Sequence, residues 1–172
     1  GTLRRHRQSL DAVAEGLGTA PQALDWPGLN EYDSDALLGA IHPQPLAPPQ
    51  SPQDARAHFR LLREALARWM EGRIAPQGMP SHAEFVAGVV AALDHVRTRH
   101  DGHVLIVSSG GPIATAVGQV LDVPPQTVID LNMRIRNSAI TEFAFNPRRH
   151  ALHSFNHLPH LDGAGYEDWV TY

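Results

Sequence analysis

The chain has 172 residues, of which 42% are hydrophobic and 19% are charged, and its formal net charge is −4 at pH 7. This length and composition predict one folded domain with a hydrophobic core, and they exclude a disordered or fibrous chain. The negative charge argues against nucleic-acid binding, the lack of cysteine excludes disulfides and thiolate catalysis, and no apolar run is long enough for a membrane span.

The first third of the chain predicts short helices separated by loops. Three arginines within residues 4–7 precede a helical pattern that runs to Leu17, and they form either an anion clamp or a solvated face. Glu31 lies in a loop ahead of a short helix over residues 33–40, which Asp33 or Ser34 caps. The proline- and glutamine-rich stretch 43–52 predicts an extended surface loop.

Two longer helices follow this loop. The first is predicted over about residues 53–71, because apolar side chains recur at spacings of three and four. The second begins at Ser81, which can form an S-x-x-E capping box with Glu84. The apolar positions are Phe59, Leu62, Leu66 and Trp69 in the first helix, and Phe85, Val89, Leu93 and Val96 in the second.

The last third predicts strands and helices of an α/β domain. Residues 103–108 contain four consecutive apolar side chains and read as a strand that is buried on both faces. A helix is expected to begin at Pro112 and run to Leu121, and two strands are expected over 139–145 and 151–155. This alternation predicts a three-layer sandwich with a mostly parallel central sheet and helices on both faces.

The strand-to-helix turn at Ser109-Gly110-Gly111 is a candidate anion site. The N-terminus of a helix offers unpaired amide groups and the positive end of a dipole, which suit a phosphate or a carboxylate. Glycines let the backbone approach an anion closely, although they are equally typical of a plain tight turn. The turn matches neither G-x-G-x-x-G nor the lysine-bearing P-loop, so it does not support nucleotide binding.

Four segments, taken in order, resemble the histidine phosphatase (phosphoglycerate-mutase-like) superfamily. Residues 5–9 resemble its R-x-x-Q-T stretch, residues 28–33 its acid-bearing L-x-E-x-D loop, residues 104–113 its V-x-H-G-G-x-I strand-to-helix motif, and residues 136–141 its N-x-S-I-T stretch. The resemblance covers about residues 1–160. We therefore expect one domain over 1–172, with a cap-like insertion at about 42–80 that shapes substrate choice.

The resemblance implies a phosphomonoester hydrolase that acts through a phosphohistidine, with a mutase of the same chemistry as an alternative. In the family, a histidine of an R-H-G motif on the first strand attacks the phosphate ester. Two arginines and a second histidine hold the phosphoryl group, and an acid protonates the leaving oxygen. Carried over to this chain, Arg5 binds phosphate and Glu31 donates the proton. Ser109 takes the place of the second histidine beside Gly110, and both contact substrate.

The chain departs from the family in two ways. It contains no R-H-G, so we expect a segment carrying the nucleophile to precede Gly1, and we expect the 172 residues alone to be inactive. Ser109 carries no charge where the family has histidine, and loss of an optimised donor weakens catalysis about a hundredfold or more. His157 and His103 are candidates to supply the missing imidazole.

Two alternatives remain open from the sequence. One is a weakened or inactive relative that binds a phosphorylated ligand or a protein partner. The other is an acyl transferase with Ser109 as its nucleophile, although the G-x-S-x-G elbow of such enzymes is missing. For the phosphatase we expect a small phosphorylated substrate, no metal or other cofactor, no nucleic acid, no membrane, a cytoplasmic location, and a homodimer as one option for its oligomeric state.

Overall fold

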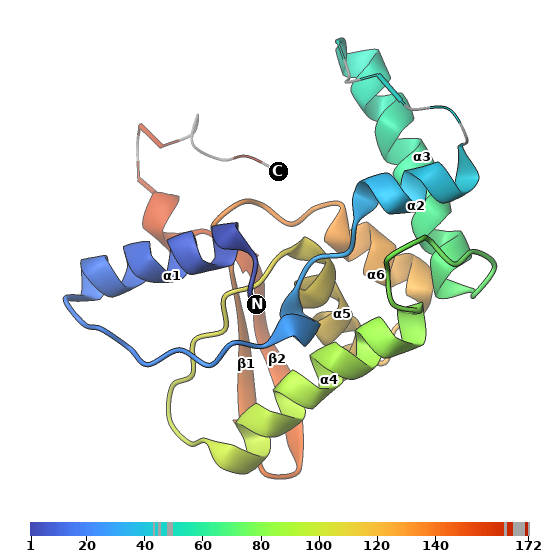
Figure 1. Ribbon diagram of the computed structural model, residues 1–172. Coiled ribbons are helices and arrows are strands. Elements are labelled where there is room, and N and C mark those ends of the chain that lie inside the picture. The colour runs from blue at the N-terminus through green and yellow to red at the C-terminus, as the bar shows by residue number, and fades with distance from the viewer. Residues whose placement is uncertain (43, 45, 48–49, 164, 167–170, 172) are drawn as a thin grey trace. The chain divides into compact units, whose positions relative to one another are not determined.

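The structure is a computed structural model, and it describes residues 1–42, 44, 46–47, 50–163, 165–166 and 171 (Figure 1). The helices are α1 (Arg4–Leu17), α2 (Ser34–Ile41), α3 (Pro52–Met70), α4 (His82–Arg99), α5 (Gly110–Leu121) and α6 (Pro125–Asn132). The strands are β1 (Ile140–Asn146) and β2 (Arg149–His157), and short 3-10 turns lie at Pro27–Leu29 and Pro159–Leu161. Four prolines of the predicted loop, at positions 43, 45, 48 and 49, lie outside the described residues.

The chain divides into two compact units. One consists of Gly1–Glu31 together with Gly88–Tyr172, and the other is Tyr32–Ala87. Arg5, Glu31, Ser109 and the start of α5 all belong to the first unit. The site predicted from the sequence therefore lies within one unit.

The second unit is helical, and its helices begin where the sequence predicts them. Asp33 caps α2, since its Oδ1 accepts from the backbone N–H groups of Asp35 and Ala36 at 2.9 and 3.0 Å. The predicted helix over 53–71 is confirmed as α3, which buries Leu66 and Trp69 completely or nearly so. Phe59 departs from the expected apolar face, because 53% of it is exposed.

The predicted capping box at the start of α4 is confirmed, and its two residues belong to the second unit: the Ser81 N–H donates to Glu84 Oε2 at 2.8 Å, and the Glu84 N–H donates to Ser81 Oγ at 3.3 Å. Helices α5 and α1 of the first unit have starts that differ from the predicted ones. Helix α5 begins at Gly110, two residues before the expected start at Pro112. Helix α1 begins at Arg4, so the arginines lie in its first turn and not ahead of it. Helix α6 was not predicted.

The two predicted C-terminal strands are confirmed as an antiparallel hairpin. Ala144 pairs with Ala151, and Asn146 pairs with Arg149 across the turn. Asn146 Oδ1 closes the turn by accepting from the N–H groups of Arg148 and Arg149. In the described part of the chain this hairpin is the whole sheet, so the expected mostly parallel central sheet is not present there.

The predicted buried strand over 103–108 is not confirmed. The segment pairs with no strand among the described residues, and Val104, Leu105 and Ile106 are 37%, 60% and 39% exposed. These side chains are exposed because the segment lines two cavities, one of about 330 Å³ and one of about 730 Å³. Its apolar composition predicts a covered strand, but none of the described segments pairs with it.

Candidate active site

Three chain segments of the first unit meet just before α5. The backbone nitrogen of Gly1 donates to Val107 O at 2.8 Å, and the hydroxyl of Ser108 donates to Leu29 O at 2.8 Å. The Thr2 N–H donates to Asn30 Oδ1 at 2.6 Å. These bonds hold the start of α1, the loop before Glu31 and the start of α5 together, so residues far apart in sequence share one place.

Ser109 is held by the first turn of α1. Arg5 Nε donates to Ser109 Oγ at 3.0 Å. Ser109 is also the N-cap residue of α5, but its side chain makes no capping bond to the described amide groups. Its hydroxyl is instead turned toward α1. The structure thus brings together the arginine and the serine that the sequence assigned to substrate binding.

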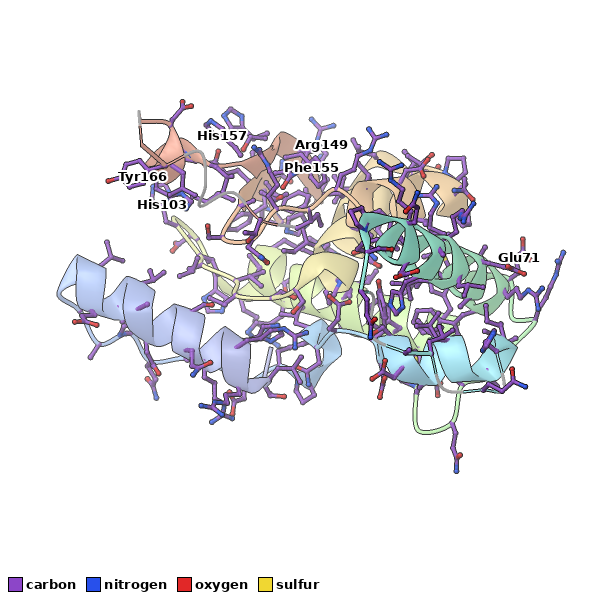
Figure 2. The ribbon with its side chains drawn as sticks, turned by 90° about the horizontal axis from the view of Figure 1, so that it is seen from above. Glu71, His103, Arg149, Phe155, His157 and Tyr166 are labelled. Carbon is purple, nitrogen blue, oxygen red and sulfur yellow. The ribbon has the colours of Figure 1, made fainter. Side chains whose placement is uncertain are left out.

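His6 is the member of this cluster that sequence reasoning missed. Its ring is 2% exposed, and its Nε2 lies 2.6 Å from Ser109 Oγ. Among the described residues this is the imidazole that contacts Ser109, and the expected candidates His103 and His157 do not. His157 lies on β2, together with Phe155 and Arg149 (Figure 2). The sequence signal that could have identified His6 is its position next to Arg5, in the segment that resembles R-x-x-Q-T.

The environment of His6 keeps its ring neutral. Burial lowers the pKa of His6 from 6.5 to about 4, and the positive charges of the Gly1 amino group and of Arg5 act in the same direction. Its Nδ1 is buried and has no hydrogen-bond partner among the described residues. At neutral pH the ring therefore carries one proton, and it adds hydrogen bonding but no charge.

Glu31 occupies the N-terminus of α5. Both of its carboxylate oxygens accept from the Gly111 N–H, each at 3.0 Å. A carboxylate is favourable there, because it meets an amide of the first turn and the positive end of the helix dipole. The helix end that the sequence assigned to a phosphate thus already holds an anion of the protein.

Gly110 packs closely at the same helix end. A Cβ atom at this position would lie 2.8 Å from Asn132 Oδ1 and 3.8 Å from Glu31 Oε2. A residue with a side chain here would have to displace the side chain of Asn132 at the end of α6. Gly110 belongs to α5 and not to a turn before it, so the reading of a plain tight turn does not describe it.

A cavity of about 330 Å³ lies next to the cluster, between the extended segment 103–106 and β1. Val89, Leu93 and Val96 of α4 line it, as do Pro112, Ile113 and Ala116 of α5. Both helices therefore face the space with apolar side chains. The second cavity, of about 730 Å³, has the same extended segment on one wall and α1 on another.

The remaining side chains give little sign of other chemistry. Within the described residues, no three His, Asp or Glu side chains gather as a metal-binding group. None of the helices in that part of the chain is long and apolar enough to cross a membrane. Residues 136–141 end in the first two residues of β1. Ahead of the strand, the Arg136 N–H donates to Asn156 Oδ1 at 2.8 Å.

A family model, described as the histidine phosphatase superfamily (branch 1), matches residues 1–158. Neither a curated protein nor a solved structure shows significant similarity to the chain. The match spans every segment that forms the cluster around Ser109, from Arg5 to the start of α5. It supports a function of the phosphatase or mutase kind in general, with small phosphorylated molecules as substrates. The chain belongs to the histidine phosphatase superfamily.

Proposed function

We propose that the protein hydrolyses phosphate monoesters through a phosphohistidine intermediate. The observation that carries this proposal is the convergence of Arg5, Ser109 and the first amides of α5, with Glu31 beside them. A guanidinium, a hydroxyl and a helix N-terminus are donors suited to a phosphoryl group. The terminal nitrogens of Arg5 are bonded to none of the described residues, so they are available to a ligand.

The reaction divides into two transfers of the phosphoryl group. In the first, a histidine nitrogen attacks phosphorus, the bond to the ester oxygen breaks, and Glu31 gives its proton to the leaving alcohol. In the second, water attacks phosphorus, Glu31 takes a proton from it, and the P–N bond breaks to release phosphate. Arg5 and Ser109 stabilise the charge on the non-bridging oxygens in both steps.

The nucleophilic histidine is proposed to lie on a strand that precedes Gly1 in the chain. The support is the cavity between segment 103–106 and β1, which apolar residues of α4 and α5 also line. A β-strand inserted there would pair with an unpaired extended segment and cover Leu105, which is 60% exposed. Ser108 and Pro112, on either side of Ser109 in the sequence, also line this cavity.

Substrate binding is proposed to release Glu31 from α5. In the resting arrangement its carboxylate uses the Gly111 N–H, the kind of donor that a phosphoryl oxygen needs. An incoming phosphate carries more negative charge and competes for this amide. Its charge also repels the carboxylate and so favours the protonated carboxyl, which is the form that a general acid needs.

A weakened relative that only binds phosphorylated ligands is the second candidate. It is favoured by two features of the cluster: Ser109 is uncharged, and the buried His6 ring is neutral. Of Arg5, His6, Glu31 and Ser109, Arg5 is therefore the one that carries a positive charge at neutral pH. Binding of phosphate without turnover by the longest natural form of the protein would select this candidate.

The proposal is tested by hydrolysis of p-nitrophenyl phosphate at mildly acidic pH. A natural form that includes the residues before Gly1 should hydrolyse it, and Glu31→Gln should slow hydrolysis about a hundredfold or more. Glu15→Gln is the matched control, since Glu15 is an exposed acid of α1 in the same unit. An intact protein of 18.8 kDa with full activity would contradict the proposed source of the nucleophile.

A further inference from the structure

The hydroxyl of Ser109 has its hydrogen-bonding capacity almost fully assigned. A serine hydroxyl has two lone pairs and one hydrogen. Arg5 Nε is always a donor, so its 3.0 Å contact uses one lone pair of Ser109 Oγ. What the hydroxyl can still do depends on whether His6 Nε2, 2.6 Å away, donates to it or accepts from it.

The surroundings of the other ring nitrogen decide the direction of this bond. If His6 Nε2 accepted from Ser109, the ring proton would sit on Nδ1, as a buried N–H without an acceptor among the described residues. Orphaned buried N–H groups are rarer in proteins than orphaned acceptors. A Cβ at Gly1 would lie 2.3 Å from His6 Nδ1, so the backbone there packs closely against this nitrogen. The proton is therefore placed on Nε2.

With the proton on Nε2, both lone pairs of Ser109 Oγ are occupied, one by Arg5 and one by His6. Its hydrogen then has no remaining role except to donate to a third group. The guanidinium charge of Arg5 polarises the hydroxyl and strengthens it as a donor. A bound oxyanion at the start of α5 is the acceptor that this geometry provides for.

We propose that His6 is a positioning residue, which fixes the Ser109 hydroxyl as a donor to a phosphoryl oxygen and so compensates in part for the missing histidine at position 109. This inference rests on the proposed phosphate site, but it does not depend on turnover. His6 acts through Ser109 and is not assigned a contact with the substrate.

The same geometry argues against a serine nucleophile. A general base must accept the hydroxyl proton, whereas Nε2 here carries a proton of its own. The low pKa of His6, about 4 because of burial, makes the ring a weak base at neutral pH. The Ser109–His6 pair therefore fits a binding role better than acyl transfer.

The first test is the ¹⁵N NMR spectrum of the His6 ring at pH 7, assigned by its loss in His6→Gln. Chemical shifts of a neutral ring protonated at Nε2 are expected. A neutral ring protonated at Nδ1 would overturn the proposal, and so would a charged ring. This measurement uses no ligand, so its outcome is independent of the proposed function.

The second test is the affinity of the full chain for inorganic phosphate. Ser109→Ala and His6→Leu are each expected to weaken binding about tenfold, and the double variant should be no weaker than either single one, because both remove the same donor. His6→Gln keeps an amide donor near the Nε2 position and should stay within about threefold of wild type. Arg7→Ala is the control on α1, since Arg7 pairs with Asp25 outside the cluster.

The outcomes separate the two proposals. Additive losses in the double variant, or wild-type affinity in His6→Leu, would overturn the role of His6 and leave the phosphate site intact. A wild-type chain that binds no phosphate would overturn the site and this inference together. Circular dichroism of each variant shows whether a loss of affinity reflects a loss of folding.

Discussion

Acidification should destabilise the 172-residue chain by about 2 kcal/mol more than it destabilises the His6→Gln variant of the same chain. Burial lowers the pKa of His6 to about 4, against 6.5 for a histidine in the unfolded chain. This difference of about 2.5 corresponds to about 3.4 kcal/mol at 1.36 kcal/mol for each pKa unit. Solvent around the exposed guanidinium of Arg5 screens part of it, which leaves about 2 kcal/mol.

The sign follows from where the protons bind. Between pH 6.5 and pH 4 the unfolded chain takes up a proton at position 6 and the folded chain does not, so the free energy of unfolding falls as the pH falls. The contribution is complete above pH 6.5, and its loss levels off below pH 4. Burial also lowers the pKa of His82 and of His150, but these residues are present in both proteins and cancel in the comparison.

Urea unfolding of both proteins at several pH values between 7.5 and 4 measures this difference. The two curves of unfolding free energy against pH should run parallel above pH 6.5 and converge below it. Curves that stay parallel down to pH 4 would contradict the lowered pKa of His6, because they would show that its ring titrates like that of an unfolded histidine.

Three further predictions concern the cluster and the cavity beside it. Glu31→Gln should lower the free energy of unfolding by about 1–2 kcal/mol, because it removes a charged acceptor from the Gly111 amide. The same variant should bind phosphate severalfold more tightly, which thermal unfolding with and without phosphate detects. Unchanged affinity would contradict a competition between Glu31 and phosphate for this amide. Ser109→His should weaken phosphate binding, because the new ring would clash with the ring of His6. Adding His6→Ala should restore or exceed the wild-type phosphate affinity, as measured by calorimetry. A double variant that binds more weakly than Ser109→His alone would contradict this clash. Leu105→Ala should change the free energy of unfolding of the 172-residue chain by less than about 0.5 kcal/mol. In a longer natural form, where the proposed strand covers Leu105, the same change should cost about 2–4 kcal/mol. Equal costs in urea unfolding of the two forms would contradict the covering strand.

Local patterns predicted the helices well, because their causes are local. The spacing of Leu62, Leu66 and Trp69 gave α3 to within one residue at each end, and the Ser81–Glu84 box marked the start of α4. The two strands of the hairpin were expected over 139–145 and 151–155, close to their observed bounds. Helix α6 was missed, because it is short and the prolines at its start read as a loop signal.

The central sheet could not be predicted in the same way, because a strand needs partners that its own sequence does not contain. The composition of residues 103–108 is that of a covered strand, while the structure leaves Leu105 60% exposed between two cavities. The resemblance to the family placed Arg5, Glu31 and Ser109 in one site; in the structure Arg5 bonds Ser109, and Glu31 bonds the Gly111 amide in the first turn of the same helix. The contact of His6 with Ser109 depends on how α1 meets the start of α5, and only the fold reveals it.

A phosphate titration followed by ¹H–¹⁵N NMR shows whether Arg5, Ser109 and the first amides of α5 form one phosphate site. We expect saturable shifts of the Gly110 and Gly111 amides and of the Arg5 Nε–H, all with a single dissociation constant. Shifts confined to other residues, or no saturation of these three signals at tens of millimolar phosphate, would contradict it.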